Sequence, residues 1–229
     1  MNSLTVSFSK REAVFGWCYM VFQLLFLGSL LGWLNYRLGS PLSLAMLNFT
    51  YYATNFLCCW VIFYRFLLHN AKRMLANFWR NILYAFSAYV LYLLLSMLVS
   101  RIIIAVRPNF GNINDASIST IAQTGFIWMS VGTVLLVPVT EELLFRGLIF
   151  RQLYSRSRFA AYACSSFFFA LVHVVAYIGN YDAVLLCLCF LQYLPAGICL
   201  GLAYEKTDSI FGSILMHAFV NLIGMLAMR

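Results

Sequence analysis

Two adjacent carboxylates, Glu141 and Glu142, stand in the otherwise apolar stretch VLLVPVTEELLFRGLIFRQL, with Arg146 four residues after Glu142. Residues four apart share one face of a helix, so Glu142 and Arg146 can form an ion pair. Glu141 points about 100° away around the same helix. We therefore expect the arginine to neutralise one carboxylate and the other to face a cavity.

Two histidines also lie inside apolar segments: His173 in SSFFFALVHVVAY and His217 in SILMHAFVN. An ionisable side chain at membrane depth costs roughly 2.5–3.5 kcal/mol, and its default interpretation is functional. Asn221 follows His217 by four residues, and Tyr177 follows His173 by four, so each pair is predicted to share a helix face. Together with the glutamates, these residues predict one shared polar site.

This set of side chains suits hydrolysis of an acyl bond without a covalent intermediate. A carboxylate and an imidazole can activate water as a general base, and histidine and asparagine can donate hydrogen bonds to an oxyanion. Two alternatives stay open: a nucleophilic Ser165 or Ser166, and a zinc site formed by Glu141, His173 and His217 without an HExxH motif. We expect no metal and no cofactor.

The composition predicts where these residues lie. The chain has 229 residues, of which 63% are hydrophobic and 10% charged, and its mean hydropathy is +0.87. Soluble domains carry roughly a quarter of charged residues. We therefore predict an all-α, polytopic transmembrane helical bundle in the cell membrane. The net charge of +8 is assigned to basic loop residues, not to nucleic-acid binding, and the seven cysteines to buried free thiols.

We expect a single integral membrane domain over residues 1–229, with a motif-bearing core at about 119–228. About seven transmembrane helices are predicted, at approximately 13–35, 42–67, 80–106, 119–137, 158–179, 182–204 and 209–228. A short amphipathic helix is expected at 139–153, after a break near Pro138. The segment 107–120, rich in Asn, Ser, Gly and Pro, is predicted to be a loop.

The basic residues predict the orientation. With the N-terminus in the cytoplasm, eleven of the fifteen lysines and arginines, Arg146 among them, fall on the cytoplasmic side and four outside. This is the bias expected of membrane proteins. It places the glutamate pair toward the cytoplasmic side, at the end of the fourth crossing.

Three motifs carry a resemblance to a known family. EELLFR (141–146) matches EExxxR, FALVH (169–173) matches FxxxH, and HAFVN (217–221) matches HxxxN. In order and separation they resemble the CAAX-protease and bacteriocin-processing superfamily of intramembrane proteases, also called the Abi family, over roughly residues 119–226. The small size and minimal loops are similar to bacterial members.

The resemblance implies a membrane-embedded cavity, open toward the cytoplasm, in which Glu141 activates water with the help of His173. It implies that Glu142 and Arg146 support the site and that His217 and Asn221 stabilise the oxyanion. The substrate would be a peptide or a membrane protein, and the process bacteriocin processing or self-immunity. Tyr177 departs from prenyl-protein proteases that carry Asn there. A non-proteolytic regulator or immunity protein on the same scaffold, and less so a proton-coupled transporter, remain alternatives.

Overall fold

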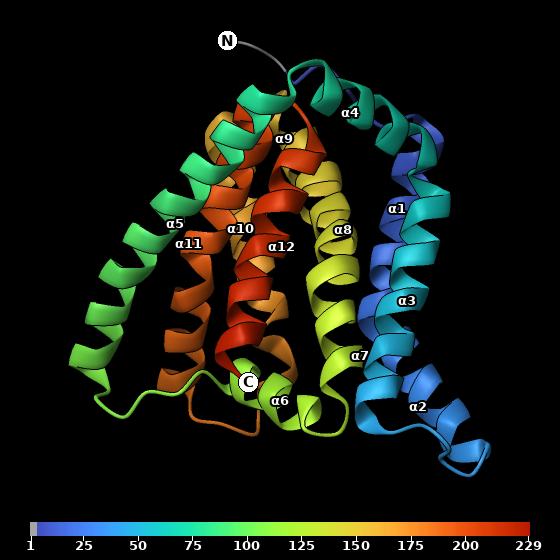
Figure 1. Ribbon diagram of the computed structural model, residues 1–229, viewed down its shortest axis with the longest axis vertical. Helices are drawn as coiled ribbons and strands as arrows, with labels where there is room; N and C mark the ends of the chain where they lie inside the picture. The colour runs from blue at the N-terminus through green and yellow to red at the C-terminus, as the bar shows by residue number, and fades with distance from the viewer. Residues whose placement is uncertain (1–3) are drawn as a thin grey trace.

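The computed structural model describes residues 4–229, and within that range the chain is helical, without a β-strand (Figure 1). The predicted all-α bundle is therefore confirmed. In chain order the helices are α1 (Lys10–Phe22), η1 (Gln23–Leu27), α2 (Gly28–Arg37), α3 (Leu44–Ile62), α4 (Tyr64–Ala76), α5 (Phe78–Val106), α6 (Ile113–Ala122), α7 (Phe126–Val131), η2 (Gly132–Leu136), α8 (Val137–Glu142), η3 (Leu143–Phe150), α9 (Arg151–Tyr154), α10 (Arg158–Val172), η4 (Val175–Tyr177), α11 (Ala183–Thr207) and α12 (Ile210–Ala227).

Four helical spans are long and apolar enough to cross a membrane: Lys10–Arg37, α5, α11 and α12. A fifth arises if α3 and α4, which are bent by 86° at their junction, count as one span. The other two predicted segments are present as the helical path from α7 to α9, which π turns divide, and as α10, which has 15 residues.

The sequence predicts a transmembrane helix from about 42 to 67, whereas in the structure α3 ends at Ile62 and the separate helix α4 follows it. Helix α4 is amphipathic and lies across one end of the bundle, near the N-terminus. Its inner face buries Phe66, Leu67, Asn70 and Met74. We call this end of the molecule, which also carries α9 and the start of α5, the N-terminal end.

The predicted break near Pro138 is wrong, because α7, η2, α8, η3 and α9 follow one another without interruption. A proline cannot donate the usual helical hydrogen bond. Here the π turn η2 ends just before it, and the N–H of Val137 donates to the carbonyl of Gly132. The expected amphipathic helix at 139–153 is wrong as well. All residues from Leu143 to Phe150 are buried, which places this segment in the core.

Two further boundaries differ from the sequence prediction. The expected loop 107–120 contains most of α6, which begins after Asn112 because that side chain accepts hydrogen bonds from the backbone N–H groups of Asn114 and Asp115. Helix α10 ends at Val172, so His173 is its C-cap and Tyr177 belongs to the separate turn η4. The expectation that His173 and Tyr177 share one helix face is therefore wrong.

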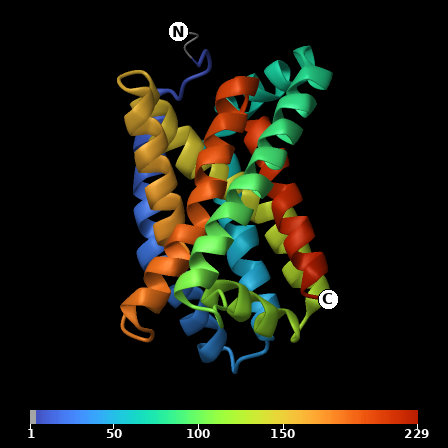
Figure 2. The same cartoon turned by 90° about the vertical axis from the view of Figure 1, so that its left-hand side faces the viewer.

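Helix α11 is central to the packing, because it contacts α5, α10 and α12 (Figure 2). Its glycines allow close approach. At Gly197 an added Cβ would lie 2.8 Å from the Cα of Ser166 on α10, so only hydrogen fits between these two backbones. Small residues at such crossings are how membrane helices pack tightly.

Replacing Gly197 with alanine should therefore destabilise the fold by about 1–3 kcal/mol, because α10 and α11 must separate. Gly224→Ala is the matched control, since an added Cβ there meets no atom within 4 Å and alanine favours a helix. Thermal unfolding in detergent measures both. Equal midpoints for the two variants would contradict the close crossing.

Candidate active site

The core of the site is an ion pair between Glu142 on α8 and Arg146 on η3, both fully buried. Nη1 of Arg146 lies 3.0 Å from Oε1 of Glu142, as the four-residue spacing predicts. Nη2 donates to the carbonyl oxygen of Gly197 at 3.0 Å, and the guanidinium lies 4.5 Å from the ring centroid of Phe169. The arginine thereby connects the EExxxR helix to α10 and α11.

His217 on α12 joins the two glutamates. Its Nδ1 donates to Oε1 of Glu142 at 2.8 Å, and its Nε2 lies 3.9 Å from Oε2 of Glu141. A carboxylate oxygen accepts hydrogen bonds, so the contact with Glu142 fixes the proton on Nδ1 and turns Nε2 toward Glu141. The imidazole is thus held between a buried carboxylate and one that lines a cavity.

Glu141 lines a cavity of about 300 Å³, together with His173, His217 and Asn221. Its side chain retains 24% exposure, and its Oε2 has no hydrogen-bond partner among residues 4–229. The expectation that one carboxylate pairs with arginine while the other faces a cavity is therefore confirmed. Glu141 is the cavity carboxylate.

His173 reaches the same cavity from the end of α10. Its Nδ1 lies 2.7 Å from the carbonyl oxygen of Phe169, which can only accept, so Nδ1 carries the proton and Nε2 keeps a free lone pair. The ring stacks on Tyr193 with centroids 4.1 Å apart. His173 is therefore fixed in both tautomer and plane.

Asn221 on α12 also lines the cavity, and its Nδ2 donates to the carbonyl oxygen of Thr133 at 2.8 Å. Thr133 belongs to the π turn η2. π turns recur at functional sites in helices. Asn221 thus makes an interhelical hydrogen bond, and its amide has a second N–H.

Some lining residues were missed by the sequence analysis. Asp115, which was placed in a loop, lies in the cavity on α6, where the hydroxyl of Tyr193 donates to its Oδ1 at 3.1 Å. Burial raises the pKa of Asp115, while the hydrogen bond from Tyr193 and the nearby His173 act to lower it. The signal in the sequence for this end of the site was the set of polar residues Asn112, Asn114 and Asp115 at the start of α6.

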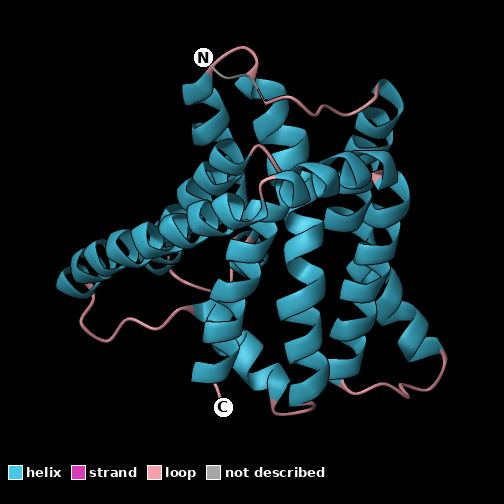
Figure 3. Ribbon diagram, turned by 45° about the horizontal axis from the view of Figure 1, so that its top comes forward, coloured by secondary structure: helices cyan, strands magenta, loops and turns pink. Residues whose placement is uncertain are grey.

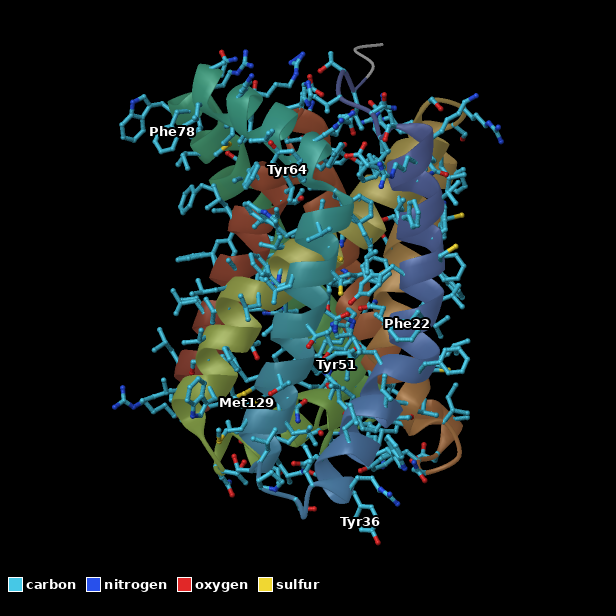
Figure 4. The ribbon with its side chains drawn as sticks, turned by 90° about the vertical axis from the view of Figure 1, so that its right-hand side faces the viewer. Phe22, Tyr36, Tyr51, Tyr64, Phe78 and Met129 are labelled. Carbon is cyan, nitrogen blue, oxygen red and sulfur yellow. The ribbon has the colours of Figure 1, made fainter. Side chains whose placement is uncertain are left out.

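The N-terminal helices contribute to the cavity as well. Gln23 of η1 and Tyr51, Tyr52 and Asn55 of α3 form its wall on that side, and Figure 4 shows Tyr51 about midway along the bundle. Asn55 also accepts a hydrogen bond from the hydroxyl of Tyr19 on α1 at 2.7 Å. These helices therefore complete the site even though they carry no motif.

A second cavity of about 310 Å³ lies on the side of α5 and shares His173, His217, Asn221, Tyr193 and Asp115 with the first. Its outer wall is apolar and includes Leu93, Leu200, Val220 and Ile223. His173, His217 and Asn221 therefore border both cavities, whereas Glu141 lines only the first.

The site lies near the middle of the helical path Phe126–Tyr154, not at the end of a crossing as the sequence predicted. The physical reason is that this path continues through η3 and α9 instead of ending at Pro138. Tyr177 does not line either cavity; its hydroxyl lies 3.4 Å from Oδ1 of Asn114.

Neither alternative chemistry gains support from the geometry. Ser165 and Ser166 are buried, and neither lines the two cavities. Within the described part of the chain, no three His, Cys, Asp or Glu side chains are grouped in a way that could hold a metal ion.

Comparison with known proteins agrees with the motifs. Residues 123–223 match the family model described as type II CAAX prenyl endopeptidase Rce1-like, and all three motifs fall inside this range. The resemblance to the CAAX-protease and Abi family is thereby confirmed for the motif-bearing core. The chain is also 33% identical, over 90 residues, to the UPF0177 protein YxdF of Lactococcus lactis subsp. lactis (strain IL1403).

That alignment covers 39% of this chain and 44% of the relative, so the chain spans less than half of the curated protein that it matches. No solved structure matches.

Replacing Arg146 with alanine should destabilise the protein by about 3–5 kcal/mol, because it leaves Glu142 buried without its cation. The double variant Glu142→Gln with Arg146→Met removes both charges and should recover much of this loss. Arg107→Ala is the control, since Arg107 and Asp182 form an exposed pair and such pairs contribute little. Thermal unfolding in detergent gives all three values. An Arg146→Ala variant as stable as Arg107→Ala would contradict the role of the buried pair.

Proposed function

We propose that the protein is an intramembrane endopeptidase that hydrolyses a peptide or membrane-protein substrate with water activated by Glu141 and His173. The observation that carries the proposal is Glu141 itself. Its side chain lines a cavity inside the bundle and keeps 24% exposure, next to a second glutamate that is fully buried against Arg146. The match to the Rce1-like family supports protease activity.

The proposed reaction begins with a water molecule between Glu141 and the lone pair of His173 Nε2. Glu141 takes a proton from this water while the water oxygen attacks the carbonyl carbon of the substrate. The peptide bond breaks as the tetrahedral intermediate collapses, and Glu141 returns the proton to the leaving amine. No covalent enzyme intermediate forms.

His217 and Asn221 are proposed to stabilise the oxyanion of that intermediate. The second amide N–H of Asn221 is available, because the first donates to Thr133. Protonated His217 would donate from Nε2, with Nδ1 held by Glu142. Once Glu141 has taken the proton from water, Glu142, Arg146, protonated His217 and the oxyanion sum to zero net charge.

Glu142 and Arg146 are proposed to hold this geometry and not to react. Glu142 orients His217, and Arg146 is itself fixed by Gly197 and Phe169. A pair held from three helices loses little entropy when substrate binds, and such rigid support is what a catalytic constellation requires.

We further propose that the N-terminus faces the cytoplasm. Arg146 is buried and cannot report orientation, but the remaining ten basic residues of that side gather at the N-terminal end of the bundle. Peptide maturation and bacteriocin self-immunity are the processes that the family resemblance suggests. Since the matched relative is covered only in part, substrate and process belong to this proposal.

Glu141→Gln and His173→Ala should each abolish cleavage while the protein still folds, because each removes a group that activates water. The measurement is cleavage of a panel of peptides and membrane-tethered reporters by purified protein, with and without o-phenanthroline. Wild-type cleavage should be insensitive to the chelator. Asp182→Asn is the matched control, since it removes an exposed carboxylate outside both cavities and should leave turnover unchanged.

Three results would contradict the proposal in different ways. Normal turnover by Glu141→Gln would remove the glutamate from the mechanism. Loss of activity with the chelator and recovery with zinc would indicate a metalloprotease. If cells that carry the Glu141→Gln variant kept the phenotype of cells that carry the wild-type protein, a non-proteolytic regulator or immunity protein would be favoured.

Asn221→Ala should lower kcat by about 100- to 1,000-fold with little change in KM, because an oxyanion donor acts in the transition state. Its bond to Thr133 is lost at the same time, so the thermal midpoint is measured in parallel. The variant Thr133→Ala keeps the backbone carbonyl that Asn221 contacts and serves as control. Equal loss in kcat and in folded fraction would assign Asn221 a structural role only.

A further inference from the structure

A separate cavity of about 830 Å³ opens at the N-terminal end of the molecule, away from the candidate active site. It lies between the corner that joins α4 to α5, the turn that joins α11 to α12, and the start of α10. Its basic lining residues are Arg73, Arg80, Arg158 and Lys206. None of these residues has a role in the proposed hydrolysis.

The cavity has an excess of positive charge. Its two acidic residues are already paired, Asp208 with Arg73 at 2.8 Å and Glu205 with Arg158 at 3.0 Å. Within residues 4–229, Arg80 and Lys206 make no ion pair. Two unpaired cations therefore face one concave space, where an anion with several acceptor oxygens, such as a phosphate, would satisfy both.

The walls of the cavity are fixed by buried polar contacts. Nδ2 of Asn81 donates to the carbonyl oxygens of Arg73 and Met74 at 3.3 and 3.1 Å, which holds the corner between α4 and α5. On the other side, Oδ1 of Asn70 accepts from the backbone N–H of Ile210 at 2.8 Å. This bond joins α4 to the turn between α11 and α12, so the basic side chains stand on a rigid frame.

The surroundings indicate the source of the phosphate. Leu75 and Trp79, beside the corner, are 71% and 80% exposed, and Figure 4 shows Phe78 pointing outward from this end. Figure 3 shows α5 leading away from the same corner, and its outer face exposes Leu83 and Phe86. Exposed tryptophan beside an apolar helix face is typical of the membrane interface.

We propose that this cavity binds the phosphate headgroup of an anionic glycerophospholipid, with Arg80 and Lys206 as its principal ligands and the acyl chains along α5. Basic pockets between transmembrane helices bind anionic headgroups in this manner. The proposal depends neither on proteolysis nor on the identity of a substrate.

Native mass spectrometry of the full-length protein in neutral detergent tests the proposal with phosphatidylglycerol and phosphatidylcholine as probes. One equivalent of phosphatidylglycerol should bind saturably, and phosphatidylcholine should bind at least about tenfold more weakly. Arg80→Gln with Lys206→Gln should raise the apparent Kd for phosphatidylglycerol about tenfold. Lys72→Gln with Arg156→Gln removes the same charge from the same end but outside the cavity, and should change Kd less than about twofold.

Arg80→Lys with Lys206→Arg keeps both charges and should retain binding, which separates loss of charge from loss of folding. Equal binding of phosphatidylglycerol and phosphatidylcholine would overturn the proposal. So would an equal rise in Kd for the two double variants to glutamine, because the binding would then depend only on the overall positive charge of this end of the molecule. Displacement of the lipid by equimolar glycerol 3-phosphate would overturn the lipid assignment in favour of a soluble phosphate ester.

Discussion

The buried contact among Glu142, Arg146 and His217 is the constraint on which the rest of the core depends. Two charges removed from water require each other and further hydrogen bonds, and the protein supplies them from separate helices. Arg146 requires the carbonyl of Gly197, which lies at a close contact between α10 and α11. Glu142 requires His217, which places α12. One ion pair thereby specifies the mutual position of the three motif-bearing segments.

The same contact separates two chemically identical side chains. Glu142 is fully buried, and its Oε1 contacts both Arg146 and His217, whereas Glu141 lines the cavity and keeps 24% of its side chain exposed. A carboxylate in the first situation is a structural anion, and one in the second can accept a proton from water. Asp115 and Tyr193 then close the other side of the cavity, next to His173.

Much of this site follows from local rules, and the sequence therefore predicts it. The i, i+4 spacing indicates the Glu142–Arg146 pair, and the cost of ionisable groups in a membrane selects His173 and His217. The missed parts depend on tertiary structure. The end of α10 at Val172 removes Tyr177 from the predicted face. The position of Asp115 depends on hydrogen bonds between the start of α6 and Gln192 and Tyr193 of α11, which no local pattern specifies. The path through Pro138 depends on a π turn, whose hydrogen bonds leave no clear mark in the sequence.

The π turn η2 also sets the phase of the helix that follows it. A π turn contains about one residue more than an α turn, so it rotates all later side chains by about 100°. That is the angle between Glu141 and Glu142. Without the extra residue, both glutamate side chains would be rotated by about 100° around the helix axis. Glu142 would then no longer face His217, and Glu141 would no longer face the cavity. The π turn η2 therefore determines which glutamate of the EE motif is buried in the ion pair and which one lines the cavity.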